Sequence, residues 1–220
     1  MTTRKKKADD ATLKAAILTA ALKHIVFDGF SDKVLAGAGK EAGADKAAIA
    51  RLYPDGPLSL VEAFSQRADA EMEERLTAMD LQAMKIRERI AAAVRARIAV
   101  LRPHKEAARR AAAFLSLPPH GLLGVKLVYR TVDAMWRAVG DTATDFNFYT
   151  KRGILAGVYS ATLLRWFTDQ SADESATERF LADRIANVMQ FEKFKAQVQE
   201  GVARLPTLAE VIDAFAVKRQ

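Results

Sequence analysis

Helical periodicity runs through nearly the whole chain and restricts its fold more than any other feature. Apolar residues recur at intervals of three and four, most regularly within 81–101, at Ala83, Ile86, Ile90, Val94, Ile98 and Leu101. This spacing places them on one face of an α-helix, because a helix turns once in about 3.6 residues. No run alternates apolar and polar residues as a half-buried strand would. The sequence therefore predicts an all-α protein.

Glycine and proline residues divide the pattern into separate helices. We expect helices over about 10–28, 32–41 and from Asp45 onward, then a break at 53–57 and a long helix beginning at Pro57. Proline suits the first helical position because the N–H that it lacks has no helical partner there. Later helices are expected at about 81–101, 104–116, 121–139, 144–168 and 174–200. The chain then divides into a basic disordered arm (1–8), an N-terminal unit (9–56), a helical bundle (57–203) and a linker with a final helix (204–220).

Several kinds of site are excluded by residue content. The chain has 220 residues and no cysteine, which rules out disulfides, thiolate nucleophiles and cysteine-ligated metals. Its three histidines, His24, His104 and His120, lie far apart and form none of the His/Glu pairs that helix bundles use for metals. No Gly-x-Ser-x-Gly elbow is present. We therefore expect no catalytic residues and no metal site.

The chain is basic, with a net charge of +7, part of which lies in Arg4-Lys5-Lys6-Lys7. Such a balance suits nucleic acid or an anionic membrane surface and proves neither. No apolar run reaches the roughly 18 residues of a membrane span, and the N-terminus lacks a secretory apolar segment. We expect a cytoplasmic protein without a transmembrane segment, peripheral on the inner membrane if the source is bacterial.

The N-terminal unit resembles the helix-turn-helix of TetR-type repressors. The residues that carry this resemblance are Gly29-Phe30, Val34-Leu35-Ala36, the turn at Gly43, the helix cap Asp45, and Ile49.

The recognition helix of this motif offers little for reading DNA. Only Lys46 and Arg51 are available for groove or phosphate contacts, and Ala50 stands where such repressors usually carry an aromatic residue. Alanine side chains cannot read base edges. We therefore expect a helix-turn-helix kept as scaffold, without DNA as a partner. A TetR-type ligand-responsive repressor is the alternative.

A second and more specific resemblance covers about 120–195. Its centre is the run from Thr144 to Arg152, TDFNFYTKR, accompanied by VDAMW at 132–136, YSAT at 159–162, DQS at 169–171 and TERFL at 177–181. These runs closely resemble the coenzyme Q protein nine family, whose members are accessory factors in ubiquinone biosynthesis.

The resemblance implies an all-α, TetR-like fold without repressor function. It also implies an apolar lipid-binding cavity in the bundle over 57–203, homodimerisation, and no enzymatic activity. The ligand would be a polyprenylated quinone intermediate or another lipid, with no other cofactor. The partner would be the di-iron demethoxyubiquinone hydroxylase, to which the lipid is delivered.

The helix that begins near Asp145 carries the candidate lipid contacts. Asp145 can cap it, and Gly153, Ala156, Gly157 and Ser160 give it a strip of small side chains. Such a strip leaves room for an apolar chain or lets another helix approach closely, and the sequence leaves both open. The predicted lipid-binding set is Phe148, Gly153, Leu155, Ala156, Gly157, Tyr159, Leu163 and Met189.

The resemblance also implies a surface that meets the hydroxylase, at Leu123, Asp133, Trp136 and Arg137. An exposed aromatic residue flanked by polar groups makes a good interface anchor. Relatives can carry an aromatic residue at the position of Arg137, so Trp136 is the main candidate. Periodicity alone is equally consistent with a core tryptophan.

The last residues predict a short amphipathic helix that contacts the membrane. Thr207 and Glu210 have capping-box spacing, and the predicted contact residues are Leu208, Val211, Ile212, Phe215, Lys218 and Arg219. The basic end would favour anionic lipid by about 1 kcal/mol per charge. Docking of this helix onto its own bundle is the alternative.

Overall fold

The computed structural model describes residues 2–141 and 146–188, with side chains at 9–141 and 148–188. Within these ranges the chain is helical and contains no strand. The α-helices are α1 (Thr2–Asp28), α2 (Asp32–Glu41), α3 (Lys46–Leu52), α4 (Pro57–Thr77), α5 (Ile86–Leu101), α6 (Lys105–Leu115), α7 (Gly121–Ala138) and α8 (Phe146–Phe167). Residues 175–188 are also helical. Short 3-10 turns lie at η1 (Leu81–Ala83), η2 (Arg102–His104) and η3 (Pro118–His120).

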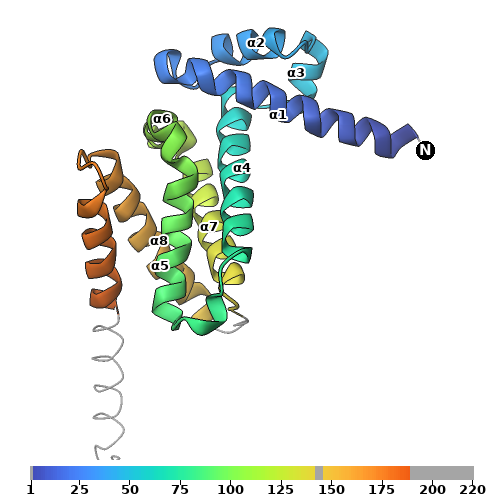
Figure 1. The fold of residues 1–220 in the computed structure, drawn as a ribbon. Helices are drawn as coiled ribbons and strands as arrows, with labels where there is room; N and C mark the ends of the chain where they lie inside the picture. The colour runs from blue at the N-terminus through green and yellow to red at the C-terminus, as the bar shows by residue number, and fades with distance from the viewer. Residues whose placement is uncertain (1, 142–145, 189–220) are drawn as a thin grey trace, which may run out of the picture.

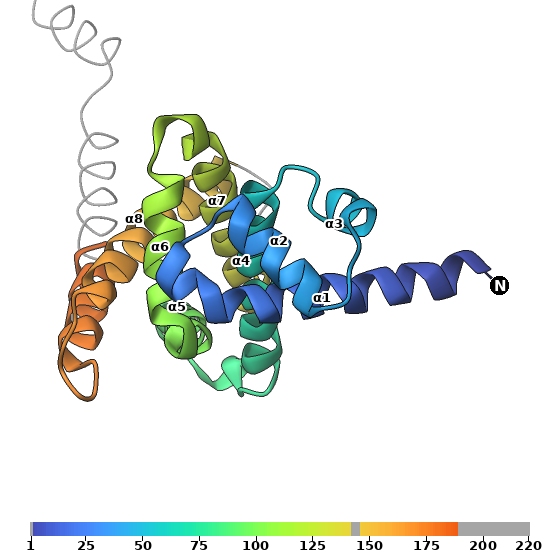
Figure 2. The same ribbon diagram turned by 90° about the horizontal axis from the view of Figure 1, so that it is seen from above.

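The helices form two layers (Figure 1). Helices α1–α3 lie across one end of a bundle built from α4–α8, and α4 runs from the first layer into the second. Seen from above, the N-terminal part of α1 projects beyond the bundle (Figure 2). In the bundle, α4 packs against α5 and α7, and α7 packs against α8.

Local chemistry sets most of the helix ends where the sequence predicts them. The Ser31 hydroxyl accepts the Val34 N–H at 3.3 Å, and the Asp45 carboxylate accepts the Ala48 N–H at 2.7 Å, so α2 and α3 each start at a side-chain cap. Gly29 and Gly43 adopt φ of +67° and +74°, which glycine reaches without a steric penalty. Pro57 is the first residue of α4, as expected.

Two expected boundaries are wrong. Helix α1 begins at Thr2 and not near residue 10, so residues 2–8 belong to this helix where we expected a disordered arm. No glycine or proline interrupts residues 2–28, which allows the helix to extend. The expected helix over 81–101 is a 3-10 turn followed by α5. The Glu88 carboxylate accepts the Lys85 backbone N–H at 3.0 Å, and this contact restarts the helix at Ile86.

An aromatic junction joins the two layers. Phe30, between α1 and α2, lies with its ring centroid 6.3 Å from that of Phe64 on α4 and 6.1 Å from that of Phe114 on α6. Both Phe30 and Phe64 are buried. Burial of large rings at this position fixes the N-terminal unit on the bundle mainly through the hydrophobic effect.

Candidate functional site

The predicted lipid-binding residues divide between two faces of α8. Leu155 and Tyr159 are buried in the bundle, at 3% and 4% exposure. Phe148, Ala156 and Leu163 are half-buried. Gly153 and Gly157 are exposed, and a Cβ atom built on either glycine would meet no other atom within 4 Å. Met189 lies outside the described residues. The small-residue strip therefore faces outward, and the large side chains face the interior.

The outward strip of α8 is bordered by large apolar side chains. Tyr149 and Leu164 are 67% and 62% exposed. They stand near the two ends of the strip that contains Gly153 and Gly157. Exposed apolar side chains beside an open small-residue strip are typical of a surface that another helix can approach closely.

The interior face of α8 meets a buried polar group that we did not predict. Arg97 on α5 is 3% exposed, and its Nε lies 3.2 Å from Oδ1 of Asp69 on α4. The Thr131 hydroxyl on α7 donates to the same Asp69 oxygen at 2.8 Å. Arg97 Nη2 donates to the carbonyl and hydroxyl oxygens of Ser65, each at 3.3 Å. We call Ser65, Asp69, Arg97, Thr131 and Tyr159 the interior polar cluster.

Burial controls the ionisation of this cluster. Burial raises the pKa of Asp69, and the neighbouring Arg97 and Thr131 oppose that rise. Burial likewise raises the pKa of the Tyr159 phenol, and the charge of Arg97 acts in the opposite direction. A sequence signal was available, since Arg97 falls on the apolar face of α5, three residues after Val94 and four before Leu101.

The run from 144 to 152, which identifies the family resemblance, has a structural role where it is described. Arg152 is 2% exposed, and its Nε donates to Oδ1 of Asp133 at 2.7 Å. Its Nη1 donates to Oδ2 of Asp141 at 3.3 Å and to the Phe148 carbonyl at 3.2 Å. Lys151 Nζ lies 2.9 Å from the other Asp141 oxygen. We call Asp133, Asp141, Lys151 and Arg152 the α7–α8 clip, because it joins the C-terminal part of α7 to the start of α8.

The predicted partner residues lie along α7. Leu123, Asp133 and Trp136 are half-buried, and Arg137 is exposed. The indole N–H of Trp136 donates to the Lys151 carbonyl at 3.2 Å, so this side chain packs partly against α8. Asp133 belongs to the α7–α8 clip, and its Oδ2 also lies 3.1 Å from Nη2 of Arg137.

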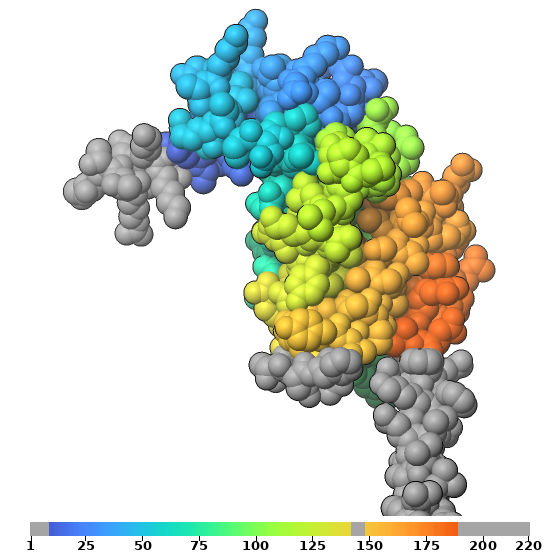
Figure 3. All heavy atoms as spheres, turned by 180° about the vertical axis from the view of Figure 1, so that it is seen from behind, coloured from blue at the N-terminus to red at the C-terminus, as the bar shows by residue number. Residues whose placement is uncertain are grey.

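A more exposed apolar stripe on α7 was not predicted. Leu122 is 85% exposed, Val125 69% and Tyr129 43%. Their spacing of three and four residues places them on one side of the helix. In the view from behind, the yellow-green atoms of α7 lie directly beside the orange atoms of α8 (Figure 3).

An open cavity of about 300 Å³ lies at the ends of α4 and α7 and is lined by Glu73, Thr77, Arg137 and Ala138. Of these four lining residues, only Arg137 belongs to a predicted site. An apolar cavity for lipid in the bundle therefore stays a prediction.

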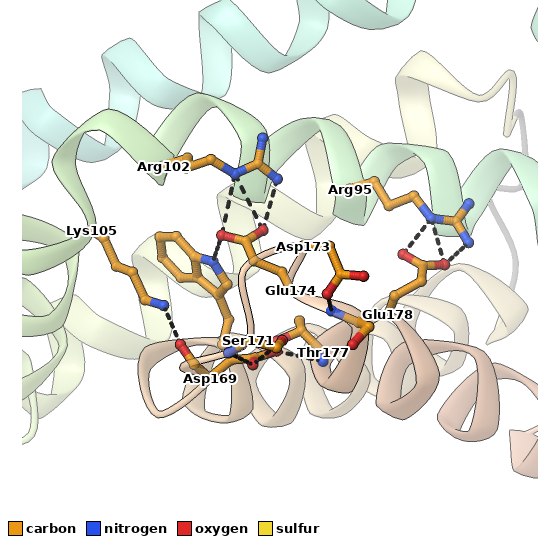
Figure 4. Close-up of polar contacts among 11 residues, drawn as sticks. Arg95, Arg102, Lys105, Asp169, Ser171, Asp173, Glu174, Thr177 and Glu178 are labelled. Carbon is orange, nitrogen blue, oxygen red and sulfur yellow. Dashed lines mark hydrogen bonds and ion pairs between the residues drawn. The ribbon is translucent and has the colours of Figure 1, made fainter.

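A polar clasp holds the segment after α8 against α5 and α6 (Figure 4). The Asp169 carboxylate accepts four hydrogen bonds, two from Ser171 and two from Thr177, at 2.6–3.0 Å. These bonds hold the pKa of Asp169 well below its usual value. Two arginines bind this segment from the other side: Arg102 on η2 pairs with Glu174 at 2.7 Å, and Arg95 on α5 pairs with Glu178.

Trp166 ties this clasp to the bundle. The Trp166 ring is buried, and its indole N–H donates to Glu174 at 2.8 Å. Lys105 donates to the Asp169 carbonyl at 3.0 Å and lies 5.0 Å from the centroid of the Trp166 ring. The clasp is thus a helix-capping and ion-pair network, in which Glu174 and Glu178 are paired with arginines and Asp169 accepts hydrogen bonds from Ser171 and Thr177.

The helix-turn-helix places α2 and α3 as the sequence predicts, but one of the two basic side chains of α3 is paired within the protein. Arg51 Nη2 lies 2.6 Å from Asp10 Oδ1 on α1, so one of the two cations of α3 is already paired within the protein. Lys46 is exposed. A seven-residue α3 with three alanines offers few groups for base edges.

The predicted membrane-contact residues at 208–219 lie outside the described residues. Within the described ranges, no single helix is both long and apolar enough to cross a membrane. Two helical segments, Ile86–Leu115 and Pro118–Ala138, meet at a bend of 96°. Together they are long and apolar enough to cross a membrane, judged by length and composition only. The described part of the chain holds no group of three His, Cys, Asp or Glu residues arranged for a metal ion.

Comparison with known proteins finds relatives that match most of the chain. The family model COQ9 matches residues 122–192. The ubiquinone biosynthesis protein COQ9, mitochondrial, of Rattus norvegicus is 33% identical over 83% of this chain and 61% of its own length. The proteins of the same name from Bos taurus and Homo sapiens are 33% and 32% identical over 85% of this chain, and over 60% and 61% of their own lengths. The chain thus spans about three fifths of the length of these relatives.

A solved structure shows the fold independently. A TetR transcriptional regulator from Nitrosomonas europaea superposes with a TM-score of 0.64 and 18% sequence identity, covering 80% of this chain and 97% of the regulator. At this identity the likeness shows the fold alone. The all-α, TetR-like architecture predicted from the sequence is confirmed.

Proposed function

Because the chain belongs to the COQ9 family, we propose that it acts in ubiquinone biosynthesis as an accessory lipid-binding protein and not as an enzyme. The observation that carries this proposal is the similarity to ubiquinone biosynthesis proteins over more than four fifths of the chain. Its basic charge and amphipathic helices are compatible with work at a lipid surface.

In this proposal the protein takes up a polyprenyl quinone intermediate or a similar lipid at the membrane surface. Transfer of a prenyl tail from water or lipid into protein requires an apolar lining, worth about 0.8 kcal/mol per buried methylene relative to water. Leu155 and Tyr159 on α8 supply such lining from the bundle side. The membrane contact is assigned to Leu208, Val211, Ile212, Phe215, Lys218 and Arg219.

The bound lipid would be presented to the di-iron demethoxyubiquinone hydroxylase. We assign the contact to α7, where Leu123, Asp133, Trp136 and Arg137 lie near the exposed stripe of Leu122, Val125 and Tyr129. An apolar stripe with a polar border is the usual composition of a protein interface. The outward strip of α8, with Gly153 and Gly157, suits close approach of a second copy in a homodimer.

Mass spectrometry of lipids that copurify with the protein tests this proposal. We expect an isoprenoid or quinone-like lipid in stoichiometric amount, and sedimentation of the protein with vesicles that contain anionic lipid. Arg219→Glu should weaken vesicle binding, whereas Lys33→Glu, an exposed cation on α2, should not. A lipid-free protein that ignores anionic vesicles would contradict the proposal.

The repressor alternative is less well supported. The pairing of Arg51 with Asp10 and the alanine-rich α3 leave few groups for DNA. A gel-shift titration against the DNA upstream of the gene separates the two functions. We expect only weak binding that salt abolishes, because phosphate contacts alone are strongly salt-dependent.

A further inference from the structure

Arg97 is a buried cation whose hydrogen-bonding capacity is only partly used. A guanidinium carries five N–H donors. Nη2 donates to Ser65, and Nε lies within ion-pair distance of Asp69. Neither Nε nor Nη1 has a partner in hydrogen-bond geometry within the described residues, and the further group that acts on the guanidinium is the Tyr159 phenol. Both atoms are fully buried.

Such a group is costly in a core that serves packing alone. More than nine in ten buried polar groups in proteins have a hydrogen-bond partner, and buried charges are normally fully coordinated. Apolar side chains at positions 69 and 97 together would remove the cost of burying the Asp69–Arg97 pair. Retention of two charges with donors left over points to an acceptor that lies outside the described residues.

The surroundings of Arg97 define what that acceptor can be. The interior polar cluster draws one or more residues from each of α4, α5, α7 and α8. Around it the bundle is apolar, with Val94 and Ile98 on α5 and Val132 and Met135 on α7 all buried. A ligand that reaches the cluster must therefore be largely apolar and carry a polar group at one end.

The charges of Asp69 and Arg97 further restrict which polar group the ligand can carry. Asp69 already neutralises most of the Arg97 charge, at an Nε to Oδ1 distance of 3.2 Å. A second anion, such as a phosphate or carboxylate, would place two negative groups around one cation in a low-dielectric interior. An uncharged carbonyl or hydroxyl oxygen accepts the spare N–H bonds without that repulsion.

We propose that Arg97 Nη1 and Nε donate hydrogen bonds to an uncharged ring oxygen, a quinone carbonyl or phenolic hydroxyl, on the head of the bound lipid. The lipid then lies between α5 and α8, with its head beside Tyr159 and its tail along the buried apolar residues. This inference rests on the proposed lipid-binding function. It makes Arg97 a specificity-determining residue, which separates oxygenated ring lipids from plain isoprenoids.

Two probes of equal shape test the inference: farnesyl-1,4-benzoquinone, and farnesylbenzene, which lacks the oxygens. Equilibrium dialysis of the full chain against each probe, with detection by mass spectrometry, gives the two affinities. We expect the wild-type protein to bind the quinone roughly ten-fold to a hundred-fold more tightly, the usual worth of hydrogen bonds from a charged donor.

The variant that tests the role of Arg97 removes both charges together. Arg97→Met with Asp69→Leu leaves no unpaired buried charge, and we expect it to lose the preference for the quinone while still binding farnesylbenzene. Arg95→Met is the matched control, because Arg95 lies on the exposed side of the same helix and pairs with Glu178. This control should keep the full preference.

A second measurement needs no variant. The infrared carbonyl band of the bound quinone should shift to lower frequency than in an apolar solvent, because a hydrogen bond from a guanidinium weakens the C=O bond. An unshifted band, equal wild-type affinities for the two probes, or a preference that survives in the double variant would each overturn the assignment. If neither probe binds, the proposed lipid-binding function fails as well.

Discussion

Two buried arginines in the same bundle have opposite environments. Arg152 is 2% exposed and holds two carboxylates and a carbonyl, with its guanidinium 3.4 Å from the centroid of the Phe148 ring. Arg97 is 3% exposed and, among the described residues, makes hydrogen bonds through Nη2 alone. Two equally buried arginines can therefore differ in how many of their N–H groups have a hydrogen-bond partner.

The contrast separates a residue that holds the fold from one that is available to a ligand. Arg152 belongs to the run that carries the family resemblance, yet its contacts with Asp133, Asp141 and Phe148 serve to hold α7 and α8 together. Arg97 belongs to no motif, yet its Nε and Nη1 lack a hydrogen-bond partner among the described residues. A residue in the most distinctive part of the sequence therefore need not be one that can bind a ligand. Substitutions of the two arginines can distinguish these roles.

The largest effect is expected for Arg152→Met. This change leaves Asp133 and Asp141 without their buried cation, which typically costs about 3 kcal/mol or more of the free energy of unfolding. Urea denaturation measures the loss. Arg137→Met is the control, because Arg137 also pairs with Asp133 but its side chain is 66% exposed, so we expect a loss under about 1 kcal/mol. Equal losses in the two variants would show that the clip does not stabilise the fold.

Arg97→Met should cost less, about 2 kcal/mol near neutral pH, because fewer hydrogen bonds are lost. Arg97 lowers the pKa of Asp69 against the larger effect of burial, so the variant raises that pKa further. A carboxyl group with a raised pKa in the folded state stabilises the fold below its unfolded pKa and loses that contribution as the pH rises. The defect should therefore be smaller at about pH 5 than at about pH 8.

The double variant Arg97→Met with Asp69→Leu sharpens this result. We expect its unfolding free energy to lie within about 1 kcal/mol of the wild-type value at both pH values, because no buried charge remains. A double variant as unstable as the single one would mean that the pair itself holds α4 and α5 together, as the clip holds α7 and α8.

A smaller and local effect is expected at the polar clasp. The pKa values of Asp169, Glu174 and Glu178 are all lowered by hydrogen bonds from their partners. A carboxylate with a lowered folded-state pKa contributes stability above its unfolded pKa, and the contribution is lost as the pH falls. Acidification from about pH 6 to about pH 3 should therefore release residues 175–188 before the rest of the bundle.

Asp169→Asn tests this release near neutral pH. Amide hydrogen exchange within 175–188 should speed up by roughly ten-fold, because the charge-assisted bonds from Thr177 are lost. Asp183→Asn, an exposed change in the same segment, is the control and should leave the exchange unchanged. If both variants exchange at the wild-type rate, the stability of this segment comes from its apolar contacts, such as those of buried Leu181.

The comparison also explains which features the sequence could predict. Gly29, Asp45 and Pro57 predict helix ends correctly because each acts on its own turn of backbone. The partnership of Arg97 with Asp69 joins residues on different helices, and only the packing of α4 on α5 brings them together. The same holds for Arg152 and Asp133. Periodicity could have marked Arg97 as a charge on an apolar face, but could not have shown that Nε and Nη1 have no hydrogen-bond partner in the described part of the chain.

A surface arginine completes the series and gives the smallest expected effect. Arg95 makes a bidentate contact with Glu178, but both side chains are 48% exposed. Water competes for these groups, so Arg95→Met should change the free energy of unfolding by about 0.5 kcal/mol or less. Added salt should reduce the difference further, because exposed charges are screened. A loss as large as that of Arg97→Met would mean that burial is not what distinguishes these arginines, and the ranking would then follow the number of hydrogen bonds alone.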